Sequence, residues 1–121
     1  MRALISVSDK SNLEFLAKEF IDLDIEIIST GGTADYLRKL SISVVDVSTV
    51  TGFPEILDGR VKTLNPFIHG GLLAKNSDPK HITQIEEYSI KKIDIVINNL
   101  YPFNKTISKK NVSINEALEN I

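Results

Sequence analysis

IDIVINNL, at residues 93–100, is the stretch that decides the fold class. Its apolar residues form an almost unbroken run, and Tyr101-Pro102 follows directly. Continuous apolar strands of this kind are typical of a parallel sheet that is covered on both faces. We therefore expect a strand here that is buried on both faces.

Similar segments alternate with helix-like segments along the chain. Short apolar runs predict strands at residues 2–7, 25–29 and 44–47. Apolar residues at helical spacing predict one helix after each of the first two strands and another that starts at Asp78-Pro79. Residues 49–73 are expected to be irregular. Strands that alternate with helices predict an α/β fold with three layers and a mostly parallel central sheet.

Two capping boxes are predicted at helix starts, Ser11 with Glu14 and Ser113 with Glu116. The second box precedes an apolar helical face formed by Ile114, Ala117, Leu118 and Ile121. The sequence stops on this face without a C-cap glycine or a polar tail. We therefore expect residues 1–121 to be one domain, C-terminally incomplete, from a longer protein.

Composition limits the possible functions. Lys plus Arg number 14 and Asp plus Glu 16, so the net charge of −2 gives no field for binding nucleic acid. Without cysteine, and with His69 and His81 as its two histidines, the chain offers no credible metal cluster. The apolar run at residues 3–7 is too short for a signal peptide or a membrane span. We expect a soluble cytoplasmic domain with no membrane partner.

Polar residues follow three of the predicted strands, where open parallel sheets bind their ligands. Two of these segments also start helices, whose N-terminal N–H groups favour phosphate. The alternatives are a tight turn at the glycine pair, a solvated surface charge at Lys10 and an apolar plug at Tyr101. The residues concerned are Ser8, Asp9 and Lys10 after the first strand, Thr30, Gly31, Gly32 and Thr33 after the second, and Asn98, Asn99 and Tyr101 after the last.

GRVKTLNPFIHGG, at residues 59–71, follows neither a helical nor a strand period. Arg60 and Lys62 lie two residues apart, so an extended segment would point both cations to one side. There they could hold a phosphate or a carbonyl group. The alternative is a pair of surface charges opposite Asp58 and Glu55.

Five motifs occur together in one order: ISVSDK at 5–10, STGGT at 29–33, DVSTVTGFPEILDGRVKTLNP at 46–66, IHGGLLA at 68–74 and NLYPF at 99–103. Together they closely resemble the N-terminal IMP cyclohydrolase domain of the bifunctional AICAR formyltransferase/IMP cyclohydrolase family. The resemblance runs from residue 2 to the end of the sequence, and GFPEILDGRVKTL is its most specific part.

The resemblance implies a methylglyoxal-synthase-like α/β domain that closes formyl-AICAR ribonucleotide to IMP with loss of water, a late step of purine biosynthesis. It implies a purine nucleotide as ligand and no metal or organic cofactor for this step. In the full protein it implies a second domain that transfers a formyl group from a folate, and a homodimer.

Carried onto this sequence, the resemblance assigns substrate-binding and catalytic residues. Phosphate and ribose would lie near Ser8, Asp9 and Lys10 and near Thr30, Gly31, Gly32 and Thr33. The base and its reacting groups would lie near Arg60, Val61, Lys62 and Thr63, with Asn98, Asn99 and Tyr101 opposite. We expect Lys62 to stabilise the formyl oxygen, Arg60 to hold the substrate, and Tyr101 to orient the closing ring or share its proton.

The sequence also departs from the family pattern. Asn65 stands where the family usually has histidine, so no role of that histidine is transferred. The family pattern continues with an Asp-Ile-Gly-Gly-type segment and an active-site lysine beyond Ile121, so we expect little or no activity from these 121 residues alone. The alternative functions are methylglyoxal synthase on the same fold and a regulatory nucleotide-binding module.

Overall fold

The computed structural model describes residues 1–120 and contains one parallel sheet. Its strands are β1 (Arg2–Val7), β2 (Glu26–Ser29), β3 (Val45–Asp46) and β4 (Ile95–Asn99), in the order β3-β2-β1-β4. β1 pairs with β2 from Arg2↔Glu26 onward and with β4 from Ala3↔Ile95 onward. The predicted α/β class and parallel sheet are confirmed.

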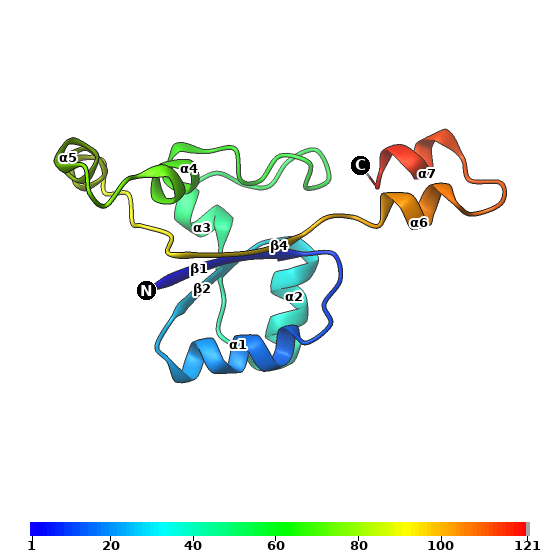
Figure 1. Cartoon of the computed structure of the whole chain (residues 1–121), viewed down its shortest axis with the longest axis horizontal. Helices are drawn as coiled ribbons and strands as arrows, with labels where there is room; N and C mark the ends of the chain where they lie inside the picture. Colours follow the sequence, from blue (N-terminus) through cyan, green and yellow to red (C-terminus); the bar gives the residue numbers. More distant parts are fainter. Residues whose placement is uncertain (121) are drawn as a thin grey trace.

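Helices cover both faces of this sheet, which makes the predicted three layers (Figure 1). On one face lie α1 (Leu13–Asp22) and α2 (Gly31–Lys39), packed through a core that includes Ile5, Phe20 and Leu37. The other face is covered by α3 (Val47–Thr51) and α4 (Pro66–Leu73), where Val47 and Ile68 pack against Leu4 and Ile28. Alternating residues of β1 therefore enter two different cores, as the strand period requires.

Three further helices extend from these layers. α5 (Pro79–Glu87) begins as predicted, with the Asp78 carboxylate accepting a hydrogen bond from Lys80 N–H at 3.0 Å. α6 (Phe103–Ile107) and α7 (Ile114–Leu118) project away from the sheet (Figure 1). Within residues 1–120, every helix is too short or too polar to cross a membrane.

The second predicted capping box forms the hydrogen bond that caps α7: Ser113 Oγ accepts from Glu116 N–H at 3.1 Å. Ile114 and Leu118 are exposed on the apolar face of α7. Ile121, which the sequence placed on the same face, lies outside the described residues.

The first predicted capping box is wrong. Asn12 is the N-cap of α1, with φ of 60°, and its side chain makes no capping hydrogen bond. The Ser11 hydroxyl instead donates to Asp9 Oδ1 at 2.6 Å. A short local bond in the β1–α1 loop thus replaces the expected cap, a competition common for Ser and Asp.

The prediction that residues 93–100 are buried on both faces is also wrong. Ile93 is buried, but Val96 is 50% exposed and Asn98 and Asn99 are exposed. β4 is more exposed than predicted because it lies at the edge of the described sheet and pairs with β1 alone.

The irregular stretch is shorter than predicted, because α3 and α4 occupy both of its ends and leave residues 52–65 as the loop. Asn65 caps α4 by accepting a hydrogen bond from Phe67 N–H at 2.9 Å, and Pro66 fits the first helical turn. Gly71 lies inside α4, where a Cβ atom would stand 2.5 Å from the Lys91 carbonyl oxygen. Glycine at this position therefore allows α4 to pack closely against the backbone at Lys91.

Candidate functional site

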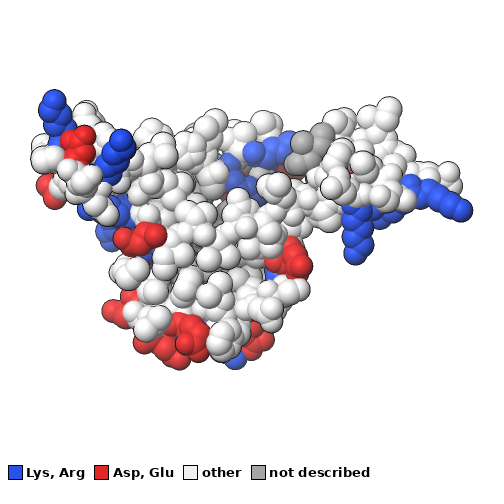
Figure 2. All heavy atoms as spheres, viewed as in Figure 1, with Lys and Arg blue, Asp and Glu red and all other residues white. Residues whose placement is uncertain are grey.

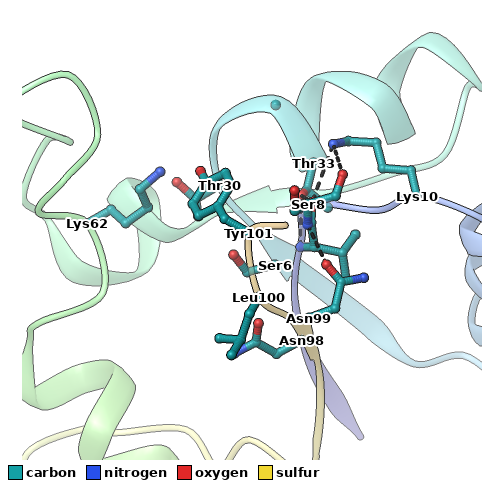
Figure 3. Close-up of a pocket in the computed structure, with 12 residues that line it drawn as sticks. Ser6, Ser8, Lys10, Thr30, Thr33, Lys62, Asn98, Asn99, Leu100 and Tyr101 are labelled. Carbon is teal, nitrogen blue, oxygen red and sulfur yellow. Dashed lines mark hydrogen bonds between the residues drawn. The ribbon is translucent and has the colours of Figure 1, made fainter. Parts of the chain in front are cut away.

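A cavity of about 290 Å³ opens beyond the carboxyl ends of β1, β2 and β4. In Figure 3, Lys62 reaches toward it from one side and Lys10 lies on the other. Two lysines and no carboxylate line the described wall, so the cavity favours an anionic ligand. The lining residues are Ser6, Val7, Ser8, Lys10, Thr30, Gly32, Thr33, Lys62, Asn98, Asn99, Leu100 and Tyr101.

Asn99 shapes the β1–α1 loop at the floor of this cavity. Its Oδ1 accepts hydrogen bonds from Ser8 N–H at 2.7 Å and Asp9 N–H at 3.1 Å. Its Nδ2 donates to the Asp9 carbonyl oxygen at 2.8 Å. Three hydrogen bonds thereby join two segments that are distant in the sequence, so Asn99 acts first of all as a clamp on the loop.

The same loop carries Lys10 and Asp9. The Lys10 ammonium lies 3.3 Å from the Val7 carbonyl oxygen and 3.4 Å from that of Ser8, so it is folded back over the end of β1. Asp9 is exposed and is not part of the cavity lining. Hydrogen bonds from the Ser11 hydroxyl and N–H lower the pKa of Asp9, which keeps this carboxylate charged.

The N-terminus of α2 forms the adjacent wall. Thr30 is 3% exposed, and its Oγ1 is a buried side-chain atom for which the described residues provide no hydrogen-bond partner. Thr33 Oγ1 is engaged, since it accepts from Val7 N–H at 3.2 Å and donates to the Val7 carbonyl oxygen at 3.1 Å. An unsatisfied buried hydroxyl at a helix N-terminus is a place where a ligand oxygen would be stabilised.

The loop at 52–65 supplies Lys62 and Arg60, but it does not have the extended form in which both cations would point to one side. Residues 57–60 form a turn closed by backbone hydrogen bonds between Ile56 and Val61. Arg60 lies in this turn and pairs with Glu119, beyond the end of α7. Lys62 follows the turn and reaches the cavity.

A second cavity of about 570 Å³ joins the two cations. Arg60 and Lys62 both line it, together with Tyr101 and Ser6. Since Lys62, Tyr101 and Ser6 also line the first cavity, the two cavities are neighbours. Arg60 therefore lines a cavity beside the first one, which we treat as the outer part of the site.

Most of the predicted residues meet at this site, and a few do not. Ser8, Lys10, Thr30 and Lys62 line the first cavity with five other predicted residues, which are Gly32, Thr33, Asn98, Asn99 and Tyr101. Asp9, Gly31, Arg60, Val61 and Thr63 do not line it. Val61 lines a separate, mainly apolar pocket together with Phe53, Ile56 and Lys62. Thr63 is not among the residues that line these cavities. Gly31 donates its N–H to Glu55 Oε1 at 3.2 Å.

Sequence reasoning missed four residues near the site. Ser6, Val7 and Leu100 line the cavity. Strand alternation could have indicated Ser6, two residues before Ser8, and Leu100, two residues after Asn98. Glu55 contacts both Gly31 and Lys62. The sequence carries no spacing signal for that contact, because it joins a helix start to a distant loop.

The distribution of charge supports the same location. Figure 2 shows acidic side chains gathered over the α1 side of the molecule, and basic side chains in the hollow beside α6 and α7. Among residues 1–120, no group of three or more His, Asp or Glu side chains is arranged to hold a metal ion. The site thus offers cations, hydroxyls and amides.

Comparisons with known proteins agree with this fold. The family model described as MGS-like domain matches residues 12–121. Bifunctional purine biosynthesis protein PurH of Bacillus subtilis is 57% identical over 120 residues, and that of Lactobacillus acidophilus is 58% identical over 120 residues. These matches cover 99% of this chain, which spans 23% of the length of either relative.

A solved structure gives the same result. The crystal structure of ForH has a TM-score of 0.77 and 39% sequence identity, and the match covers 84% of this chain and 51% of ForH. The likeness to PurH proteins inferred from the sequence motifs is confirmed, and the matching segment is their N-terminal part. The chain therefore belongs to the MGS-like domain family.

Proposed function

We propose that this domain takes part in purine biosynthesis as an IMP cyclohydrolase, closing formyl-AICAR ribonucleotide to IMP with release of water. One observation carries the proposal: a single cavity brings together the N-terminus of α2, two lysines and a tyrosine, so that phosphate-binding groups and a cation with a tyrosine for the reacting groups line one space. The printed name of the PurH relatives, bifunctional purine biosynthesis protein, supports this choice of pathway.

The nucleotide phosphate would bind where the β1–α1 loop meets α2. The backbone N–H groups of Gly32 and Thr33 lie at the positive end of the helix dipole, and both residues line the cavity. The partnerless Thr30 hydroxyl would donate to a phosphate oxygen, and the Lys10 ammonium would add a charge. Ser8 and Asn98 would contact the ribose or its neighbourhood.

The reacting groups would then lie between Lys62 and Tyr101. The carboxamide nitrogen attacks the formyl carbon, a carbon–nitrogen bond forms, and negative charge grows on the formyl oxygen. The Lys62 ammonium would stabilise that oxygen, and one such fixed donor is typically worth about 3 kcal/mol of the barrier. The oxygen finally leaves as water, with one proton from the carboxamide nitrogen and one from the formamido nitrogen, as the ring's carbon–nitrogen double bond forms.

The remaining parts of the proposal concern orientation and context. Tyr101 would orient the closing ring, and Arg60 would hold the outer part of the substrate. Holding the carboxamide nitrogen close to the formyl carbon in near-attack geometry would further increase the reaction rate. The step as written balances without a metal or an organic cofactor. We place the activity in the cytoplasm, within a homodimeric full protein.

The test is a calorimetric titration of the chain with IMP beside its Lys62→Ala variant. Saturable binding of IMP that weakens in the variant is expected. Absence of IMP binding would contradict the proposal. Equal binding by both proteins, with no cyclisation in the full protein, would favour a regulatory nucleotide-binding module. Formation of methylglyoxal from dihydroxyacetone phosphate would favour methylglyoxal synthase.

A further inference from the structure

Glu55 bridges two parts of the site that the sequence keeps apart. It lies on the loop at 52–65, and its Oε1 accepts a hydrogen bond from Gly31 N–H, at the start of α2, at 3.2 Å. Its other carboxylate oxygen, Oε2, lies 3.8 Å from Lys62 Nζ. One carboxylate thus joins a helix N-terminus to the cation of the loop.

The bridge is packed into a slot. A Cβ atom at Gly59 would lie 3.0 Å from Lys62 Nζ and 3.4 Å from Glu55 Oε2. On the α2 side, a Cβ atom at Gly31 would lie 3.5 Å from Lys62 Nζ. Side-chain exposures of 28% for Lys62 and 29% for Glu55 show that solvent reaches the pair only partly.

The charges explain why a carboxylate is needed at this point. The N-terminus of a helix carries a partial positive charge, which repels an ammonium group placed beside it. Lys62 Nζ lies beside the first residue of α2, so it would be driven outward without a compensating anion. Glu55 lies against both positive groups and offsets that repulsion.

We propose that Glu55 is a positioning residue, which holds the Lys62 ammonium at the rim of the cavity. This rests on the proposed function, in which Lys62 acts on the formyl oxygen. Glu55 is not part of the lining of the first cavity, so it acts through Lys62 and not on the ligand. It uses the Gly31 N–H and leaves Gly32 and Thr33 facing the cavity.

The variants Glu55→Gln and Glu55→Ala separate the charge from the hydrogen bond. Glutamine keeps an oxygen that can accept from Gly31 N–H and loses the charge, whereas alanine loses both. The matched control is Glu14→Gln, which removes a carboxylate from the exposed Glu14–Lys18 pair on α1. Each variant is titrated with IMP in the wild-type and Lys62→Ala backgrounds.

We expect Glu55→Gln to weaken IMP binding about threefold to tenfold in the wild-type background, and to change nothing once Lys62 is alanine. The Gly31 amide should stay protected from hydrogen exchange in Glu55→Gln and lose protection in Glu55→Ala. Equal weakening in both backgrounds, or wild-type affinity in Glu55→Gln, would overturn the proposal.

A measurement on the ligand-free chain tests the role of Glu55 independently of the proposed function. In the ligand-free chain, the NMR resonance of Lys62 Cε should move in Glu55→Gln and stay unchanged in Glu14→Gln. If wild-type chain does not bind IMP but this resonance moves, the proposed function fails and the positioning by Glu55 stands. An unmoved resonance overturns the positioning whatever IMP does.

Discussion

Arg60 and Glu119 form an ion pair across 59 positions of the chain, and so tie the turn at 57–60 to the end of α7. Both side chains are more than half exposed, so the pair adds little stability. Arg60 lines the outer part of the site, however, and Glu119 lines the same cavity. In the ligand-free domain, Glu119 therefore holds the guanidinium that the proposal assigns to the substrate.

The first prediction concerns this competition. Glu119→Gln should tighten IMP binding about twofold to fivefold, because an exposed ion pair of roughly 0.2–1 kcal/mol no longer has to be broken. The measurement is a calorimetric titration. The control is Glu116→Gln, which breaks a different ion pair of α7, the one between Glu116 and Lys109. Unchanged or weaker binding in Glu119→Gln would show that Arg60 does not leave Glu119 for the ligand.

The second prediction separates the two ends of the cavity. Lys10→Ala should weaken binding of IMP about tenfold and leave binding of inosine, which lacks the phosphate, unchanged. The reason is that Lys10 lies at the end of β1, beside the proposed phosphate position. Competition titrations with both compounds measure this. A matching loss for inosine would place Lys10 beside the base or ribose instead.

The third prediction concerns the clamp made by Asn99. Asn99→Ala removes three hydrogen bonds to Ser8 and Asp9 and should lower the free energy of unfolding by about 1–2 kcal/mol, since these exposed bonds are each worth little. It should also weaken IMP binding, because the loop loses its shape. Urea denaturation and calorimetry check both effects. Wild-type stability with lost binding would instead indicate direct contact with the ligand.

The fourth prediction compares two glycines in helices. Gly71→Ala should destabilise the domain by about 2–3 kcal/mol, because its Cβ would stand 2.5 Å from the Lys91 carbonyl oxygen, a backbone atom. A Cβ at Gly32 would meet no atom within 4 Å, so Gly32→Ala should leave stability unchanged or slightly higher. Thermal unfolding of both variants tests the contrast, and equal effects would contradict it.

The fifth prediction concerns acid stability. The hydrogen bond from the buried Arg2 guanidinium lowers the pKa of Glu26 below 4.5 in the folded state. The unfolded chain therefore binds more protons as the pH falls from about 4.5, and the stability that Glu26 contributes is lost as pH passes through the folded pKa. Unfolding free energy should fall less steeply over this range in Glu26→Gln. Parallel curves would exclude Glu26 as a source of acid sensitivity.

Elements with strong local signals could be predicted from the sequence. The strand at residues 2–7 and the helix after Asp78-Pro79 have the expected bounds, because apolar runs and a proline at the first helical turn are local features. The burial of residues 93–100 was mispredicted, because an apolar run does not tell how many strands lie beside it. The number of neighbouring strands depends on the order of strands in the sheet, which local sequence does not determine.

The α4 helix shows a second limit of local reasoning. Glycine weakens helices, and the pair Gly70-Gly71 lies in the stretch that was expected to be irregular. Packing against the Ile90 side chain and the Lys91 carbonyl oxygen overrides this preference, since larger residues would not fit. Close approach between segments 20 residues apart leaves no periodic signal.

The candidate site was predicted in part for a similar reason. The rule that ligands bind at the carboxyl ends of parallel strands located Lys10, Thr30 and Tyr101 correctly near one cavity. The partners of the loop cations, Glu55 for Lys62 and Glu119 for Arg60, depend on the turn at 57–60. This turn includes Leu57 at a φ of 54°, and leucine rarely adopts a positive φ, so the sequence carried little sign of it.

The central place of β1 in the sheet has a consequence for synthesis on the ribosome. β1 is made before both of its partners and can pair with β2 once residue 29 has been added, but its other edge pairs with β4, where Ala3 meets Ile95. The hydrogen bonds between β1 and β4 therefore cannot form until most of the chain has left the ribosome. Such distant pairing slows folding, and it leaves an open apolar edge on the nascent chain until residue 99 has been added.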